Sequence, residues 1–141
     1  MVLEDRSLDP KVLMAQGMAQ GMNGLPENYL KGIELFNAGS FYECHEVLEE
    51  IWLKAEGTER EFLHALIQAA AALYHDQRGN LKGAEGVFTR AKRNFDSLPR
   101  IVMRLDIPGF VCLLEDYLAR TRRSGSIVNP PLIQLTDKNH D

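Results

Sequence analysis

The sequence has few cysteines, which limits the covalent and metal frameworks that can hold it together. Only Cys44 and Cys112 occur in 141 residues, far apart and outside any C-x-x-C pattern. A disulfide framework or a cysteine zinc site is therefore not expected, and each cysteine is predicted to be a small buried hydrophobic residue. This cysteine usage favours a reducing, cytoplasmic setting.

The sequence also lacks the long apolar runs of membrane proteins and the motifs of common enzyme families. No run approaches the length of a membrane span, and the first residues carry Glu4, Asp5 and Asp9 instead of a signal-peptide core. A Gly-rich phosphate loop, G-x-S-x-G, H-E-x-x-H and a dinucleotide fingerprint are all absent. We therefore expect no membrane association and find no complete catalytic motif.

The composition that remains is typical of one globular domain. Hydrophobic residues make up 45% and charged residues 26% of the chain. The charge is uneven: residues 1–77 hold 5 basic and 13 acidic side chains, whereas residues 78–141 hold 11 basic and 7 acidic ones. Such asymmetry can steer self-association or attract an anionic partner. Nucleic-acid binding is not favoured, because the protein is acidic and few aromatic residues accompany its basic clusters.

Hydrophobic periodicity predicts an all-α fold, a compact bundle of about five helices. The helices are expected over about residues 26–37, 41–55, 59–77, 81–97 and 107–122. The third is apolar over most of its circumference, which predicts a central, buried helix. Capping boxes are predicted at two helix starts and single caps at two others; the residues are Ser40 with Glu43, Thr58 with Glu61, Asn80 and Asp106.

Two stretches of the sequence repeat at an offset of 40 residues. Gly39 matches Gly79, and the apolar positions that follow, such as Cys44 and Ala84, match in the same register. This repeat predicts two tandem helical hairpins that resemble tetratricopeptide hairpins and close into a compact bundle.

The predicted domain covers residues 26–123. Residues 1–25 are expected to form a partly ordered N-terminal arm, in which three methionines recur every four residues: Met14, Met18 and Met22. Residues 124–141 are expected to form an extended or disordered tail, from which three apolar side chains can dock on the domain: Leu132, Ile133 and Leu135.

Polar candidates for a functional site concentrate on the second and third predicted helices: Glu43, His45, Glu46, Glu49, Trp52, Gln68 and His75. His45 falls at the edge of the apolar face beside Trp52, and Glu49 lies one turn further on, within its reach. Glu43 and Glu46 point away from that face. If the two helices pack antiparallel, the His45–Glu49 edge would meet Gln68 or His75 in one buried polar cluster.

Three interpretations of this cluster stay open. It can be a structural hydrogen-bond network in a non-enzymatic binding or interaction protein, with a protein partner or a second copy of the chain as its target. It can hold a divalent metal in a hydrolase-like enzyme, with His45, Glu49 and His75 as ligands and Glu46 as base. Helical di-metal sites need two Glu-x-x-His pairs, and only Glu61–His64 supplies one here. The third interpretation is a helical-repeat scaffold with an exposed apolar groove.

The residues of the two hairpins resemble a known family. The segments that carry the likeness are Leu35-Phe36-Asn37-Ala38-Gly39, Phe41-Tyr42-Glu43-Cys44-His45-Glu46, Leu48-Glu49 with Trp52, Leu66-Ile67-Gln68-Ala69-Ala70 with His75, and Gly79-Asn80 with Gly83-Ala84. Over about residues 27–98 they resemble the small helical proteins of the domain-of-unknown-function 309 family. The resemblance implies a compact all-α fold with no established activity. It also implies that the seven polar candidates act as a unit.

Overall fold

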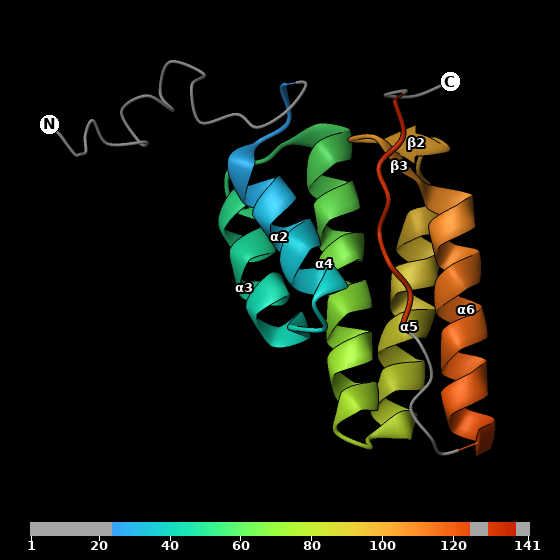
Figure 1. The fold of residues 1–141 in the computed structure, drawn as a ribbon. Helices are drawn as coiled ribbons and strands as arrows, with labels where there is room; N and C mark the ends of the chain where they lie inside the picture. Colours follow the sequence, from blue (N-terminus) through green and yellow to red (C-terminus); the bar gives the residue numbers. More distant parts are fainter. Residues whose placement is uncertain (1–23, 125–129, 138–141) are drawn as a thin grey trace, which may run out of the picture.

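The structure, a computed structural model, describes residues 24–124 and 130–137 (Figure 1). Most of the predicted N-terminal arm, including its three methionines, lies outside the described residues. The elements are α2 (Glu27–Asn37), α3 (Phe41–Trp52), α4 (Gly57–Gln77), α5 (Leu81–Asp96), β2 (Ile101–Val102), β3 (Leu105–Asp106) and α6 (Ile107–Ser124). The predicted all-α fold class is confirmed, with one short strand pair added to it.

The helices pack as two hairpins and a closing helix. α2 and α3 form the first hairpin and lie on one side of α4, α4 and α5 form the second, and α6 lies beside α5 (Figure 1). The central position predicted for α4 is confirmed, because this helix packs against both α3 and α5 and buries a large apolar surface. Its buried residues are Phe62, Leu63, Ala65, Leu66, Ile67, Ala69, Ala70, Ala72 and Leu73.

The two hairpin turns have the same backbone structure, as the 40-residue repeat predicts. Gly39 and Gly79 have φ angles of +81° and +80°, a conformation that glycine adopts without steric cost. The residue after each glycine closes the preceding helix: the Ser40 amide donates to the Leu35 carbonyl and the Asn80 amide to the His75 carbonyl, both at 2.9 Å. This bonding is the Schellman pattern of helix ends. The tandem hairpins are therefore a real structural repeat.

The two predicted capping boxes are wrong. Ser40 occupies the N-cap of α3, but its side chain makes no capping hydrogen bond. Asn80 has a similar backbone conformation, and its side chain accepts a hydrogen bond from the Gly83 amide at 3.0 Å. α4 begins at Gly57, which places Thr58 inside the first turn instead of at the cap.

Sequence analysis missed the short β hairpin between α5 and α6. β2 and β3 pair antiparallel, and the turn residues Met103 and Arg104 both have positive φ angles, of 48° and 67°. Such turns usually carry Asn-Gly or Asp-Gly, and this sequence carries neither signal. The hairpin is held from the core, because the buried hydroxyl of Tyr29 donates to the Met103 carbonyl at 3.0 Å.

The Tyr29 hydroxyl provides a test of this anchor. Tyr29 is fully buried, and burial raises the pKa of its phenol. We expect Tyr29→Phe to lower the free energy of unfolding by about 1–2 kcal/mol, because the Met103 carbonyl loses its partner inside the protein. Urea denaturation followed by circular dichroism measures this change. An unchanged midpoint would mean that water replaces the hydroxyl, and that the hairpin does not depend on it.

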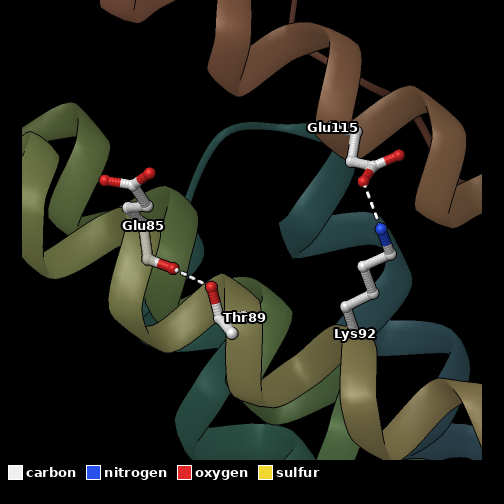
Figure 2. A network of polar contacts seen from close by, with 4 residues as sticks. All are labelled: Glu85, Thr89, Lys92 and Glu115. Atoms are coloured by element: carbon white, nitrogen blue, oxygen red, sulfur yellow. Dashed lines mark hydrogen bonds and ion pairs between the residues drawn. The ribbon is translucent and has the colours of Figure 1, made fainter.

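Polar contacts hold α6 against the rest of the bundle at two positions along the helix. Figure 2 shows Lys92 of α5 reaching the carboxylate of Glu115 of α6, a bond that raises the pKa of Lys92. It also shows the Thr89 hydroxyl donating to the Glu85 carbonyl within α5. Further along α6, the Thr121 hydroxyl donates to Asp76 of α4 at 2.9 Å. These bonds orient α6 along both helices of the second hairpin.

The cysteines and the helix lengths complete the comparison with the sequence. Cys44 is buried, as predicted, and burial raises the pKa of its thiol to about 12. Cys112 is exposed on α6, so the prediction that both cysteines are buried is wrong for Cys112. Among the described residues, no helix combines the length and the apolar character needed to cross a membrane.

Candidate functional site

A surface of aromatic rings and carboxylates covers the seam between α3 and α4. The Tyr42 ring stacks on the His45 ring of the next helical turn, with centroids 6.0 Å apart and planes 24° apart. The Tyr42 ring also lies 5.4 Å from the Tyr74 ring of α4, centre to centre, in a tilted contact. Glu46 and Glu49 lie on the same part of α3. We call these five residues, Tyr42, His45, Glu46, Glu49 and Tyr74, the acidic–aromatic surface.

The carboxylates dominate the electrostatics of this surface. Glu46 lies one turn after Tyr42, and its charge and its hydrogen bond to the phenol raise the pKa of Tyr42. Tyr74 and Glu49 contribute in the same direction, and slight burial of the phenol adds to them. The Tyr42 side chain is nevertheless 48% exposed. The ring is therefore accessible to solvent in a negative potential.

His45 and Glu49 form the pair that the sequence predicts. Nε2 of His45 lies 3.5 Å from Oε2 of Glu49, and the side chains are 30% and 47% exposed. The other ring nitrogen, Nδ1, is buried and has no hydrogen-bond partner among the described residues. The pair thus lies at the rim of the bundle, with one side of the imidazole against the apolar core.

An arginine of the chain already uses one ring of this surface. The guanidinium of Arg78 lies 5.4 Å from the centre of the Tyr74 ring, and its Nη1 donates to the Tyr74 hydroxyl at 3.0 Å. Arg78 follows Tyr74 by one helical turn, a spacing at which side chains on a helix meet. The contact combines cation–π attraction with a hydrogen bond.

Trp52 belongs to a different set of contacts from His45. Its ring stacks on His64 of α4 at 5.8 Å, and the Arg60 guanidinium lies 4.3 Å from its centre. Arg60 also donates to the Trp52 carbonyl at 2.9 Å and so satisfies the C-terminal end of α3. The expected place of Trp52 beside His45 is therefore corrected: Trp52 is the last residue of α3, and its ring contacts His64 and Arg60.

Gln68 and His75 also find partners away from His45. Gln68 accepts a hydrogen bond from Asn94 of α5 at 2.6 Å. Nδ1 of His75 lies 3.2 Å from Nδ2 of Asn80, in the turn before α5. Gln68 therefore ties α4 to α5, and His75 supports the turn between them.

The predicted single buried cluster is thus divided among several sites. None of its seven residues is fully buried, and Thr121 is the one buried polar residue among residues 24–121 and 130–137. The physical reason is the position of α3, which packs mainly against α2 and α4. Its inner face is filled by Cys44 and Leu48, and its polar residues remain at the rim or, like Glu43 and Glu46, in solvent.

The proposed metal ligands do not converge. Within the part of the chain that the structure describes, no group of three or more His, Cys, Asp or Glu side chains is placed to hold one metal ion. Of the three predicted ligands His45, Glu49 and His75, only the first two are joined, and His75 pairs with Asn80. The residues present therefore do not fit the divalent metal centre that the sequence suggested.

The sequence did not predict the roles of the tyrosines and arginines in the acidic–aromatic surface and around Trp52. Tyr42 and Tyr74 each have a charged neighbour one turn further on, Glu46 and Arg78. That spacing was the available signal. The contact between the two rings could not be foreseen, since it depends on the register of α3 against α4.

The comparisons with known proteins place this helical pair in a family. The sequence profile described as Domain of unknown function (DUF309) matches residues 29–87, which contain all of α3 and α4 and hence the acidic–aromatic surface. The chain belongs to the DUF309 family. The family name carries no activity, so the assignment supports the fold and leaves the function to the site.

Two curated proteins are similar to part of this chain. An uncharacterised protein of Aquifex aeolicus (strain VF5) is 29% identical over 107 residues, or 75% of this chain and 31% of the relative. The uncharacterised protein YpuF of Bacillus subtilis (strain 168) is 33% identical over 84 residues, or 58% of this chain and 48% of YpuF. This DUF309 chain thus spans less than half the length of either curated relative.

A solved structure supports the fold. The crystal structure of a conserved hypothetical protein from Thermus thermophilus aligns with a TM-score of 0.58 and 34% sequence identity. The alignment covers 64% of this chain and 95% of the Thermus chain. Nearly all of that chain therefore has a counterpart here, whereas about a third of the present chain lies outside the alignment.

Proposed function

We propose that this DUF309 protein is a non-enzymatic interaction module whose acidic–aromatic surface binds a lysine- or arginine-bearing segment of a protein partner. The observation that carries the proposal is the Tyr42 ring, which is partly exposed to solvent and has Glu46 and Glu49 beside it. An aromatic face attracts cations through its quadrupole, and nearby carboxylates add a direct charge attraction. A guanidinium group can stack on the aromatic ring and pair with the carboxylates at the same time.

The chain's own arginines support the choice of ligand. Arg60 lies over Trp52 and Arg78 lies over Tyr74, so two rings of this seam each already hold a guanidinium. No lysine or arginine of the described residues lies over Tyr42. Tyr42, which is 48% exposed, is therefore the tyrosine of this surface that holds no guanidinium of the chain itself.

The charge of the first hairpin favours the same partner. Residues 27–56 carry seven acidic and two basic side chains, and Glu43, Glu46 and Glu50 of α3 are all exposed. A negative field of this kind accelerates encounter with a basic segment and weakens as salt is added. Modest, salt-sensitive affinity is what we expect of such a surface.

The test is a titration of the isotope-labelled protein with a short oligo-arginine peptide at low salt, followed by NMR. We expect the largest amide shifts at Tyr42, Glu46 and Tyr74. Replacing both carboxylates, as Glu46→Gln/Glu49→Gln, should weaken binding about fivefold, because exposed ion pairs contribute about 0.2–1 kcal/mol each.

A matched control distinguishes binding at the acidic–aromatic surface from attraction to the net negative charge of the protein. Glu59→Gln/Glu61→Gln removes the same two charges from exposed positions at the start of α4 and should change the affinity less than about twofold, since its distance from Tyr42 leaves mainly screened long-range attraction. Equal losses in the two variants would mean that the peptide responds only to net charge, and the proposal would then fail. Shifts confined to another surface would have the same consequence.

A further inference from the structure

Residues 130–137 lie extended against the helical body, after the connection of residues 125–129 from α6 (Figure 1). Asn37, the last residue of α2, holds this segment by two hydrogen bonds to a single residue. Its Nδ2 donates to the Ile133 carbonyl at 3.0 Å, and its Oδ1 accepts from the Ile133 amide at 2.7 Å. Near the end of the segment, the Thr136 amide donates to the Arg104 carbonyl at 2.8 Å. We call the surface that receives residues 130–137 the tail groove.

The hydrogen bonds in the tail groove are made to main-chain groups of the segment that lies there. A side-chain amide that both donates to and accepts from one residue replaces the partner that a neighbouring strand would offer. Such bonding does not depend on the identity of the residue that is held. Extended peptides are commonly recognised in this way, with main-chain hydrogen bonds for affinity and pockets for alternate side chains for specificity.

Alternate side chains of the segment enter the core. Pro131 is buried, Ile133 is only 4% exposed, and Leu135 packs against the core. Leu132 and Gln134, between them, are exposed. The segment therefore turns a proline, a branched apolar residue and a further apolar residue, at every second position, towards the helices.

The segment is open on the side that faces α6. A hollow of about 190 Å³ lies there, lined by residues of β3, α6 and the segment, and its lining includes Leu113 and Leu132, which are 50% and 49% exposed. The segment is thus covered on one side only and has few fully buried residues. A segment held in this way can leave the groove without unfolding the helices, because local openings need only the free energy of the contacts that break.

We infer that the tail groove is a receptor site for an extended peptide of a partner protein with the pattern Pro-x-Ile-x-Leu or a close apolar equivalent. The chain's own residues 130–137 fill this site as an internal competitor. The segment seated in the groove defines the chemistry of the occupant, because any partner must reproduce its main-chain bonds to Asn37 and its buried alternate side chains. This inference is independent of the acidic–aromatic surface and of the function proposed for it.

The experiment uses a fluorescent peptide with the sequence of residues 130–137 and the full chain carrying Ile133→Asp, whose charged side chain keeps its own segment from seating. Fluorescence anisotropy should show that this variant binds the peptide at least about tenfold more tightly than the unchanged chain does, because the internal competitor is removed. Asn37→Ala in the same variant should weaken binding by about tenfold, as expected for the loss of two hydrogen bonds.

Two controls keep the result specific. A peptide carrying Ile133→Asp should not bind, whereas one carrying Leu132→Ala, altered at an exposed position, should bind nearly as well as the original. If Ile133→Asp prevents folding of the full chain, as circular dichroism would show, Ile133→Ala takes its place with the same expected order of affinities.

The inference fails if a folded variant does not bind the peptide, or if Asn37→Ala has no effect on binding. Light scattering identifies the source of a trans-bound segment. If the unchanged chain is a dimer that excess peptide separates into monomers, a second copy of the chain supplies the segment, and the assignment to a partner protein is overturned.

Discussion

Replacing Phe110 by alanine is expected to lower the free energy of unfolding by about 3–5 kcal/mol, the usual effect of deleting a buried aromatic ring. Phe110 of α6 is 3% exposed. Its ring makes edge contacts with Phe36 of α2 at 5.6 Å and with Phe95 of α5 at 6.1 Å. Removing it leaves a cavity where three helices meet.

The loss of stability is expected to affect the whole bundle, because these aromatic rings form a continuous series of contacts through the molecule. Phe95 continues to Phe62 of α4, and Phe36 continues to Phe41 of α3. This series of edge and tilted ring contacts therefore joins all five helices of the described fold. Unfolding of the variant should remain a single transition, since no helix has a core of its own.

Urea denaturation, followed by circular dichroism and by Trp52 fluorescence, measures this prediction. Leu113→Ala, on the same helix but 50% exposed, is the matched control and should cost less than about 1 kcal/mol. Two separate transitions in the Phe110 variant, or a loss similar to that of the control, would show that α6 is an appendage to the two hairpins and contributes little to their core.

Most of the helical framework could be predicted because local signals and burial agree in it. The apolar period of residues 41–52 predicts α3, and Gly39 and Gly79 predict the two turns, since positive φ at these positions favours glycine. The Asn80 and Asp106 side chains were predicted as caps, and both accept bonds from amides three residues later. Where a short-range interaction determines the local structure, the residues at that position are enough to predict it.

The β hairpin and the path of the tail could not be predicted, because contacts far apart in the sequence determine them. Met103 and Arg104 adopt positive φ without glycine or asparagine, and the turn depends on Tyr29, 74 positions away. Ile133 is held by Asn37, 96 positions away. No local pattern encodes such pairs.

The candidate site shows the same division between local and distant contacts. The His45–Glu49 pair is a one-turn contact within α3, and the structure contains it. Joining this pair to Gln68 and His75 required the rotation of α4 against α3. The rotation in the structure turns Gln68 towards α5, so the helix period alone could not give the composition of the site.

Gly32 is the position where the packing of the first hairpin is most sensitive to a single added carbon atom. A Cβ at this buried residue of α2 would lie 2.6 Å from Cδ2 and 3.0 Å from Cγ of Leu48, and Leu48 is itself only 1% exposed. We expect Gly32→Ala to lower the free energy of unfolding by about 1–2 kcal/mol, because overpacking of about 1–3 kcal/mol exceeds the gain in helix propensity of up to about 1 kcal/mol.

Gly86→Ala is the matched control, and its expected effect has the opposite sign. Gly86 is exposed within α5, and an added Cβ would meet nothing within 4 Å, so alanine should raise the free energy of unfolding by about 0.5–1 kcal/mol. Because both glycines lie inside helices, the propensity gain is common to the two variants. The difference between their denaturation midpoints therefore isolates the contact with Leu48. Equal stabilisation in both variants would mean that Leu48 moves aside without cost, and that α2 and α3 are less tightly packed than their close approach indicates.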